Sequence, residues 1–198
     1  MRGLRVNAVV GILALQGAFE AHELAVRRCG APTIQVRTPE DLERVDALVM
    51  PGGESTTMSH LLNTSGLFDP IAKRLSDDMV VFGTCAGMIL LAQTVHDARP
   101  DQQSFATLDI DVRRNAYGRQ VDSFECDLDV SGLGEPFHAV FIRAPRVERV
   151  GEGVEVLASH QDVPVLVRQG RVLAASFHPE LTNDDRIHER FVSMVTEV

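Results

Sequence analysis

The chain of 198 residues has no tryptophan, a single tyrosine and only three cysteines, and its acidic residues outnumber its basic ones. Three cysteines without a C-x-x-C pair fit neither a disulfide framework nor a zinc ribbon, so we expect a reducing compartment. A formal net charge of −9 argues against nucleic acid and anionic membrane surfaces as partners, because both attract basic proteins. No apolar run approaches the roughly 20 residues of a membrane span.

The bulk composition is that of a folded protein. Hydrophobic residues make up 44% of the chain, which is enough for a buried core. The length, and the lack of a linker or repeat, predict a single domain over residues 1–198. We find no apolar segment with a small-residue cleavage site near the start, so we expect the protein to be cytoplasmic.

The first half alternates strand and helix patterns. Short apolar runs are typical of strands buried on both faces, and we place them at 6–15, 33–36, 47–50 and 79–83. Helix patterns lie between them, at 18–29, from Thr38 onward, at 56–62 and at 70–75. This alternation predicts a three-layer α/β fold, an open and mostly parallel central sheet with helices on both faces.

The second half is richer in strands. Residues 94–107 are polar and loop-like, and helical spacing predicts a last helix at 184–195. The predicted strands, separated by turn residues, lie at 108–113, 121–128, 139–142, 154–158, 163–168 and 172–177. Because tight turns join antiparallel strands, we expect some of them to be extra antiparallel strands on the central sheet.

The strongest signal is a Gly-Thr-Cys-Ala-Gly motif at 83–87, between an apolar strand pattern and an apolar helix pattern. Such a turn, a nucleophile elbow, raises one side chain above the sheet, and the flanking glycines suit its strained backbone. Here that side chain is Cys85, placed at a helix N-terminus, where the helix dipole favours a thiolate. The alternative, a small buried hydrophobe, is the interpretation we favour for Cys29 and Cys126.

His178 is the best match for the base that a thiolate nucleophile needs, because it follows the strand at 172–177 in a Phe-His-Pro-Glu segment. Pro179 favours extended backbone at His178, and side chains two apart on an extended chain point the same way. Glu180 is therefore expected beside the imidazole, accepting its ring N–H. The alternative is a surface histidine next to a solvated glutamate. The acid follows the histidine, unlike the order in α/β-hydrolases.

An oxyanion needs two preorganised N–H donors. One is expected from Ala86, the residue after the nucleophile. The second is expected from the Pro-Gly-Gly-Glu-Ser-Thr-Thr loop at 51–57, which follows the strand at 47–50. This loop also fits a plain glycine-rich turn with Ser55 or Thr56 as a helix N-cap, and both interpretations can hold. No Gly-Lys-Ser/Thr follows, so the loop is no phosphate-binding P-loop.

The other polar residues give weaker signals. Six arginines form a basic stretch in the second half, and we expect most of them to lie on the solvated surface. One or two of them could instead hold a substrate carboxylate. They are Arg113, Arg114, Arg119, Arg143, Arg146 and Arg149. The remaining histidines show no metal-ligand spacing: His22, His60, His96, His138, His160 and His188. Zinc-protease, EF-hand and dinucleotide motifs do not occur, so we expect neither a metal nor a cofactor.

The motifs at 83–87 and 177–180 together resemble those of class I glutamine amidotransferase domains. Five further segments narrow the resemblance to the glutaminase subunits of pyridoxal 5′-phosphate synthases, and they lie at 15–18, 51–57, 114–124, 141–145 and 176–182. The resemblance implies a flavodoxin-like sheet and a glutaminase without a cofactor, in which Cys85 attacks glutamine, His178 moves protons and Glu180 orients His178. It also implies that ammonia leaves as a γ-glutamyl thioester forms on Cys85, and that water then hydrolyses this thioester.

The resemblance assigns roles to further residues. The amides of Gly53 and Ala86 would form the oxyanion hole. The positions that match the family's glutamine-binding residues are Gly53, Glu54, Ser55, Arg114, Ile142 and Arg143. The implied partner is a (β/α)₈ synthase subunit, which uses the ammonia to build pyridoxal 5′-phosphate from a pentose phosphate and a triose phosphate. Gln16 and Gly17 fall in a segment that family members use near the oxyanion hole and the partner.

The chain departs from the family pattern at 96–107, which lacks the usual Gly-Leu before the strand that carries the substrate arginine. This leaves the conformation of that loop open. Three alternatives remain from the sequence alone: a glutaminase with another acceptor partner, a related cysteine hydrolase or peptidase, and a non-catalytic regulatory subunit. The pair Arg114 and Arg143 argues against a peptidase, and the intact Cys85, His178 and Glu180 argue against a non-catalytic subunit.

Overall fold

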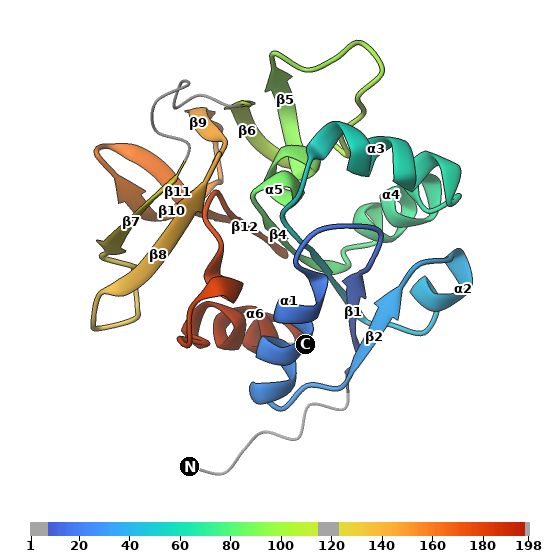
Figure 1. Cartoon of the computed structure of the whole chain (residues 1–198), viewed down its shortest axis with the longest axis horizontal. Coiled ribbons are helices and arrows are strands. Elements are labelled where there is room, and N and C mark those ends of the chain that lie inside the picture. The colour runs from blue at the N-terminus through green and yellow to red at the C-terminus, as the bar shows by residue number, and fades with distance from the viewer. Residues whose placement is uncertain (1–7, 115–122, 197–198) are drawn as a thin grey trace.

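The computed structural model describes residues 8–114 and 123–196. Seven strands form a central sheet in the order β10-β11-β12-β4-β3-β1-β2 (Figure 1). Its five parallel strands are β1 (Val10–Leu13), β2 (Thr33–Val36), β3 (Ala47–Met50), β4 (Val80–Thr84) and β12 (Val172–Ala175). The predicted three-layer α/β fold is confirmed.

Helices cover both faces of this sheet (Figure 1). They are α1 (Phe19–Arg28), α2 (Pro39–Leu42), α3 (Ser55–Thr64), α4 (Phe68–Ser76), α5 (Ala86–Leu91) and α6 (Arg186–Thr196). Successive strand residues face opposite sides: Val49 and Phe82 pack with residues of α1 and α6, whereas Leu48 and Val81 pack with those of α2 to α5. The core is therefore divided into two layers, one on each side of the sheet.

Strands of the second half extend the sheet and add to it. The antiparallel strands β11 (Val163–Gln169) and β10 (Glu155–His160) follow β12 at one edge, as predicted. The others form two small sheets: β5 (Ala92–His96), β6 (Leu108–Arg113) and β9 (Arg146–Val150) in one, β7 (Ser123–Leu128) and β8 (Phe137–Ile142) in the other.

Three sequence predictions need correction. The expected loop at 94–107 begins inside β5, which pairs with β6 in parallel. The segment of β9, where the sequence predicted no strand, is a strand paired with β6, although its arginines are exposed as expected. The first strand is shorter than the predicted 6–15, since β1 covers Val10–Leu13 and residues 6–7 lie outside the described part of the chain. Other predicted boundaries agree within a few residues.

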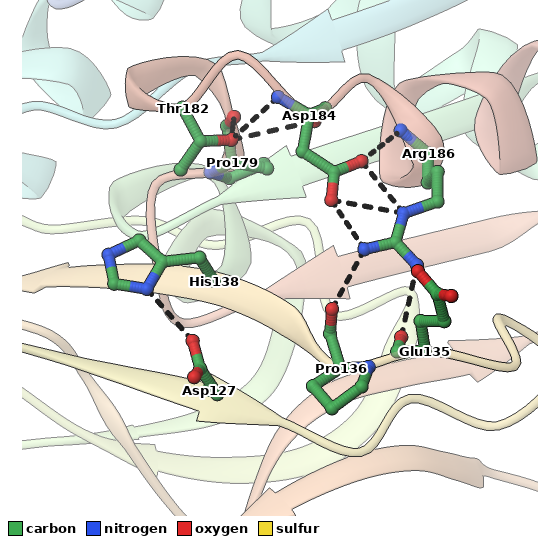
Figure 2. A network of polar contacts seen from close by, with 8 residues as sticks. All are labelled: Asp127, Glu135, Pro136, His138, Pro179, Thr182, Asp184 and Arg186. Carbon is green, nitrogen blue, oxygen red and sulfur yellow. Dashed lines mark hydrogen bonds and ion pairs between the residues drawn. The ribbon is translucent and has the colours of Figure 1, made fainter.

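The segment after β12 is anchored to the β7–β8 hairpin, as Figure 2 shows. Arg186, the first residue of α6, donates hydrogen bonds to the Asp184 carboxylate and to the backbone carbonyls of Glu135 and Pro136. Thr182 donates to the Pro179 carbonyl at 3.0 Å. These contacts fix the turn between the strand end and α6. Within the described ranges, the molecule contains no helix with the length and hydropathy to cross a bilayer.

Candidate active site

Cys85 lies at the junction of β4 and α5 in a strained backbone conformation. Its φ is 49° and its ψ is −101°, a region that residues with a Cβ atom rarely adopt. The Cys85 N–H donates to the carbonyl of Ala175 at the end of β12 with an N–O distance of 2.8 Å. The turn is therefore held by the neighbouring strand, and it places the sulfur at the carboxyl edge of the parallel sheet, where open α/β folds bind ligands.

Two glycines are required for this geometry. A Cβ on Gly87 would lie 2.1 Å from the carbonyl oxygen of Met50, so only glycine lets α5 pack this closely on β3. A Cβ on Gly52 would lie 2.4 Å from Cε1 of His178. The loop after β3 therefore brings its backbone against the imidazole. Glycine at both positions allows three distant segments to meet.

His178 and Glu180 meet beside Cys85. His178 follows β12, and its backbone N–H donates to the carbonyl of Val140 in β8 with an N–O distance of 2.8 Å. Its Nδ1 lies 2.8 Å from Oε1 of Glu180. Glu180 is not on extended chain, as the sequence suggested, but in the 3₁₀ helix η1 (Pro179–Leu181). The turn nevertheless directs its carboxylate at the imidazole.

The charges in this group depend on one another. Burial by itself lowers the pKa of His178, but hydrogen bonds with Cys85 and Glu180 outweigh it and raise that pKa to about 10. Burial raises the pKa of Glu180, yet its electrostatic interaction with the N–H edge of His22 and the hydrogen bond from His178 hold that pKa below its ordinary value. With Nδ1 engaged by Glu180, Nε2 is the ring nitrogen left for the Cys85 sulfur. The geometry supports an imidazolium between a sulfur and a carboxylate.

A cavity of about 240 Å³ opens in front of the sulfur. It is lined by Gly53, Glu54, Ser55, Cys85, Ile89, Arg114, Ile142, Arg143 and His178. All six residues predicted to bind substrate therefore lie around one hollow, and Ile89 is an addition. Ala86 follows Cys85 as the first residue of α5. A larger and more open hollow of about 500 Å³ lies beside β10, but neither a cysteine nor a histidine lines it.

Glu54 is both a helix cap and a partner of Arg114. Its carboxylate accepts hydrogen bonds from the backbone N–H groups of Thr56 and Thr57, at 3.0 and 2.7 Å, so Glu54 and not Ser55 or Thr56 is the N-cap of α3. Burial opposes ionisation, but these hydrogen bonds lower the pKa of Glu54 to about 2. Nη2 of Arg114 lies 3.2 Å from the same carboxylate. Gln16 donates to the Glu54 carbonyl at 2.6 Å and so secures the loop from the other side.

Gln102 is a residue of this site that the sequence analysis missed. Its side-chain oxygen accepts from Nη1 of Arg114 at 2.5 Å, and its Nε2 lies 3.2 Å from Oγ of Ser55. It belongs to the loop whose conformation the sequence left open. Phe105 anchors that loop, stacking on Phe68 with ring centroids 4.6 Å apart. Gln102 therefore joins two of the predicted substrate-binding residues.

We expect replacement of Gln102 by alanine to raise the KM for glutamine about tenfold while kcat stays unchanged. The lost contacts leave Arg114 and Ser55 free to move before substrate binds, and hydrogen bonds to charged groups contribute about 1.5–3 kcal/mol. Steady-state ammonia release measures both constants. Gln103→Ala is the matched control, since Gln103 contacts Asn63 and Ser59 instead. A lower kcat at unchanged KM for Gln102→Ala would contradict this role.

The remaining cysteines and histidines lie elsewhere or behind the site. The pKa of the Cys29 thiol is raised to about 12 by burial and the nearby Asp185, and burial also raises that of Cys126. Within the described ranges, no three His, Cys, Asp or Glu side chains are grouped as metal ligands. Two further histidines missed by the sequence analysis, His22 and His188, lie buried behind Glu180. The sequence did hold a signal that both are buried: each histidine lies four residues before a buried valine, and therefore on the same face of its helix.

The basic stretch divides into surface and site residues. Arg113 of β6 pairs with Glu148 of β9 and with Asp97, which directly follows β5, and Arg149 of β9 pairs with Asp109 of β6. Arg114 and Arg143 instead line the cavity. Arg119 and the rest of 115–122 fall outside the described residues.

Comparison with known proteins identifies the family. The family model described as "SNO glutamine amidotransferase family" matches residues 12–197. The chain belongs to the SNO glutamine amidotransferase family. A relative from Mycobacteroides abscessus, named pyridoxal 5′-phosphate synthase subunit PdxT, is 57% identical over 190 residues, covering 96% of this chain and 98% of the relative. A relative of the same name from Salinispora arenicola is 54% identical, covering 94% of this chain and 96% of its own.

Solved structures agree with this SNO family assignment. A crystal structure of a glutamine amidotransferase, 52% identical, superposes with a TM-score of 0.89 over 94% of this chain and 98% of its own. The structure of PurLQS from Thermotoga maritima is only 15% identical, and its TM-score is 0.65 with 96% of each chain covered. That second likeness shows the fold alone. The expected amidotransferase fold is confirmed.

Proposed function

We propose that the chain is the glutaminase subunit of a pyridoxal 5′-phosphate synthase and hydrolyses glutamine to glutamate and ammonia. The observation that carries the proposal is the strained Cys85 beside an imidazole that Glu180 holds. The relatives that share more than half of this sequence are named as subunits of that synthase. We further propose that residues 1–198 form one glutaminase domain, working in a reducing, cytoplasmic setting that keeps the Cys85 thiol free.

In the first half-reaction, the Cys85 sulfur attacks the side-chain amide carbon of glutamine. The C–S bond forms, and the carbonyl electrons move onto oxygen. His178 then gives its Nε2 proton to the departing nitrogen as the C–N bond breaks, so that ammonia leaves and a γ-glutamyl thioester remains. Glu180 accepts the Nδ1–H throughout, which keeps Nε2 of His178 directed at the reacting atoms.

In the second half-reaction, water replaces ammonia. His178 takes a proton from water as the C–O bond forms and keeps it as the C–S bond breaks, so that sulfur leaves as a thiolate beside the imidazolium and the new γ-carboxyl group loses its proton to solvent. Glutamate leaves, and Cys85 and His178 return to their starting state. In both steps the charge on the carbonyl oxygen needs N–H donors, and we propose the amides of Gly53 and Ala86 for this role, because one lies at the cavity wall and the other begins α5 behind Cys85.

The cavity walls offer complementary charges for a free amino acid. Arg114 and Arg143 suit the α-carboxylate of glutamine, and the ionised Glu54 suits its α-ammonium group. The remaining predicted contacts, from Gly53, Ser55 and Ile142, lie on the same walls. A peptide substrate lacks at least one of these free charges. The arrangement therefore favours glutamine over a peptide.

The function implies a partner that consumes ammonia. A glutaminase that belongs to a synthase hands its ammonia to a synthase subunit, and we propose a (β/α)₈ subunit that combines it with a pentose phosphate and a triose phosphate. Ammonia that escaped would be lost as ammonium at neutral pH. We therefore propose that full glutaminase activity requires the partner, so that glutamine is consumed only when the acceptor is present.

The test is ammonia release from glutamine by the purified chain, with and without an untagged synthase subunit co-purified from the same cells. We expect the partner to increase the rate at least about tenfold, equivalent to about 1.4 kcal/mol at the transition state. Turnover of peptides but not of glutamine would favour a cysteine peptidase. If a diazo-ketone analogue of glutamine failed to label Cys85 in the complex, a non-catalytic subunit would be the better interpretation.

A further inference from the structure

A chain of buried polar groups continues behind the Cys85 site. His22 of α1 is fully buried, and its Nε2 lies 3.2 Å from Oε2 of Glu180. The same nitrogen lies 3.0 Å from Oγ1 of Thr84 in β4, the residue before Cys85. On the far side, Nδ1 of His22 lies 2.9 Å from Nε2 of His188, which is equally buried in α6. Side chains of two helices and a strand thus meet at His22, and His22 in turn reaches the outer oxygen of the Glu180 carboxylate.

The positions of the protons follow from the contacts. Two facing ring nitrogens 2.9 Å apart need one N–H between them. Nδ1 of His188 has no hydrogen-bond partner among the described residues, and a buried N–H without an acceptor is costly. The proton of His188 therefore lies on Nε2 and is donated to Nδ1 of His22. His22 then carries its own proton on Nε2, on the side of Glu180.

The reverse arrangement fails on both sides. It would leave a bare nitrogen of His22 facing the Glu180 carboxylate, and a buried N–H on His188 without an acceptor. In the arrangement we assign, the N–H of His22 is donated to Oγ1 of Thr84 at 3.0 Å, and it also faces Oε2 of Glu180 at 3.2 Å. Among the described residues, Oε2 of Glu180 accepts no hydrogen bond of good geometry, so the contact with the N–H of His22 is an electrostatic one at 3.2 Å. The outer oxygen of Glu180 thus lies against the polar edge of His22, while the inner oxygen accepts from His178.

Both histidines are neutral, because burial lowers the pKa of each, that of His188 to about 3. Asp185 and Arg28 also act on His188 from the outer side, in opposite directions. A neutral N–H donor stabilises the ionised carboxylate without competing with His178 for its charge. Two charged imidazoles around one carboxylate would instead repel one another. The arrangement leaves the negative charge of Glu180 available to His178.

We propose that His22 is a positioning residue for the triad, and that it holds Glu180 in the rotamer that fixes the proton of His178 on Nδ1. His188 sets the tautomer of His22 and is one step further from the reaction. The proposal deepens the glutaminase function proposed above and depends on it. It also gives a role to two histidines, far apart in sequence, that bind no substrate.

Variant kinetics test the proposal. We expect His22→Leu, which keeps a similar volume but has no donor, to lower kcat about 10–100-fold, as loss of an orienting partner typically does, with the KM for glutamine within about twofold of wild type. His22→Gln places an amide N–H near the same point and is expected to restore kcat to within about threefold of wild type. His188→Leu removes the donor to Nδ1 of His22 but no contact to Glu180, and is expected to lower kcat by less than His22→Leu does.

A second measurement reads the protons directly. In ¹⁵N-labelled protein, the long-range ¹H–¹⁵N spectrum of the imidazoles should show His22 and His188 as Nε2–H tautomers between pH 6 and 8. An Nδ1–H tautomer of His22 would overturn the proposal. So would wild-type kcat in His22→Leu, or equal losses in His22→Leu and His188→Leu, which would indicate a structural role only.

Failure of this proposal can be told apart from failure of the proposed function. If Cys85→Ala kept full partner-stimulated ammonia release, the proposed Cys85-dependent mechanism of glutamine hydrolysis would be wrong, whereas the tautomers would still be observed. If Cys85→Ala were inactive while His22→Leu matched wild type, only the role of His22 would fall. Circular dichroism and thermal melting of each variant show whether the measured kcat is that of folded protein.

Discussion

Replacement of Cys85 by alanine is expected to lower partner-stimulated glutamine hydrolysis by at least about 10⁴-fold, which is typical for removal of a catalytic nucleophile. The sulfur is the only atom in the cavity that can form the thioester, because the other lining groups are hydroxyl, carboxylate, guanidinium, imidazole or aliphatic. Without it, water would have to attack the amide directly, with no covalent intermediate. Ammonia release, measured in a coupled assay with the synthase partner present, gives the rate.

The other two cysteines provide the control. Because burial raises the pKa of the thiols of Cys29 and Cys126, both remain protonated and unreactive near neutral pH. Neither lines the cavity. Cys29→Ala and Cys126→Ala should therefore keep wild-type activity. If Cys85→Ala retained ammonia release while either control lost it, the nucleophile would lie elsewhere in the molecule.

Much of the fold could be predicted because its central strands are buried on both faces. β3 is a continuous apolar run, β4 is apolar up to its last residue Thr84, and neither has an exposed residue. Such runs are recognisable without any knowledge of their neighbours. The turn at Cys85 was predictable for a different reason: the backbone there tolerates few residue types, so the glycine spacing is specific. Local constraints of this kind leave a clear trace in the sequence.

The strands that the sequence missed lie at the surface. β9 has the sequence Arg-Val-Glu-Arg-Val, and only Val147 is buried. Its charges form ion pairs with β6 and with neighbouring carboxylates, such as Arg149 with Asp109 and Asp111. In β5, Gln93 and Thr94 are exposed. Such strands are held in a small sheet by ion pairs and backbone hydrogen bonds. Their polar composition is that of a solvated loop, so hydrophobic patterns do not reveal them.

Part of the site was also beyond the reach of sequence patterns. The motif residues were predicted because their spacing within one segment carries the chemistry. The contact between His22 and His188 joins residues separated by 166 positions in the sequence. The contact between Gln102 and Ser55 joins residues separated by 47 positions. Neither pair has a local spacing, so only the packing of α1 on α6, and of the loop at 97–107 against α3, brings them together. These residues support the site rather than form it.

Replacement of Glu180 by glutamine is expected to lower kcat about 10³–10⁴-fold, as the loss of the orienting carboxylate does in related triads. If the amide oxygen of the new side chain accepts from His178, its NH₂ group faces the N–H of His22. If the amide turns around, its NH₂ group faces Nδ1 of His178 and moves that proton to Nε2. In the second arrangement the imidazole can no longer accept a proton from Cys85.

An exposed pair of the same kind is the control for this variant. His138 lies 2.9 Å from the carboxylates of Asp127 and of Glu125, but on the outer surface of the β7–β8 hairpin. Glu125→Gln should therefore leave kcat and KM unchanged. Ammonia release with saturating partner is measured for both variants. Wild-type kcat in Glu180→Gln would show that His178 needs no carboxylate to hold its tautomer.

The same replacement should reveal itself in the pH dependence of stability. Since the folded pKa of His178 is raised to about 10, the stability that its charge contributes is complete below pH 6.5 and is lost as the pH rises through 10. Since the folded pKa of Glu180 is lowered, the stability that its charge contributes is complete above pH 4.5 and is lost as the pH falls below that value.

The difference in unfolding free energy between wild type and Glu180→Gln, measured by urea denaturation, should therefore be largest between about pH 4.5 and 6.5 and decline above that range. A difference that grew between pH 7 and 10 would mean that His178 is neutral beside Glu180, and the ion pair on which the proposed mechanism depends would be absent.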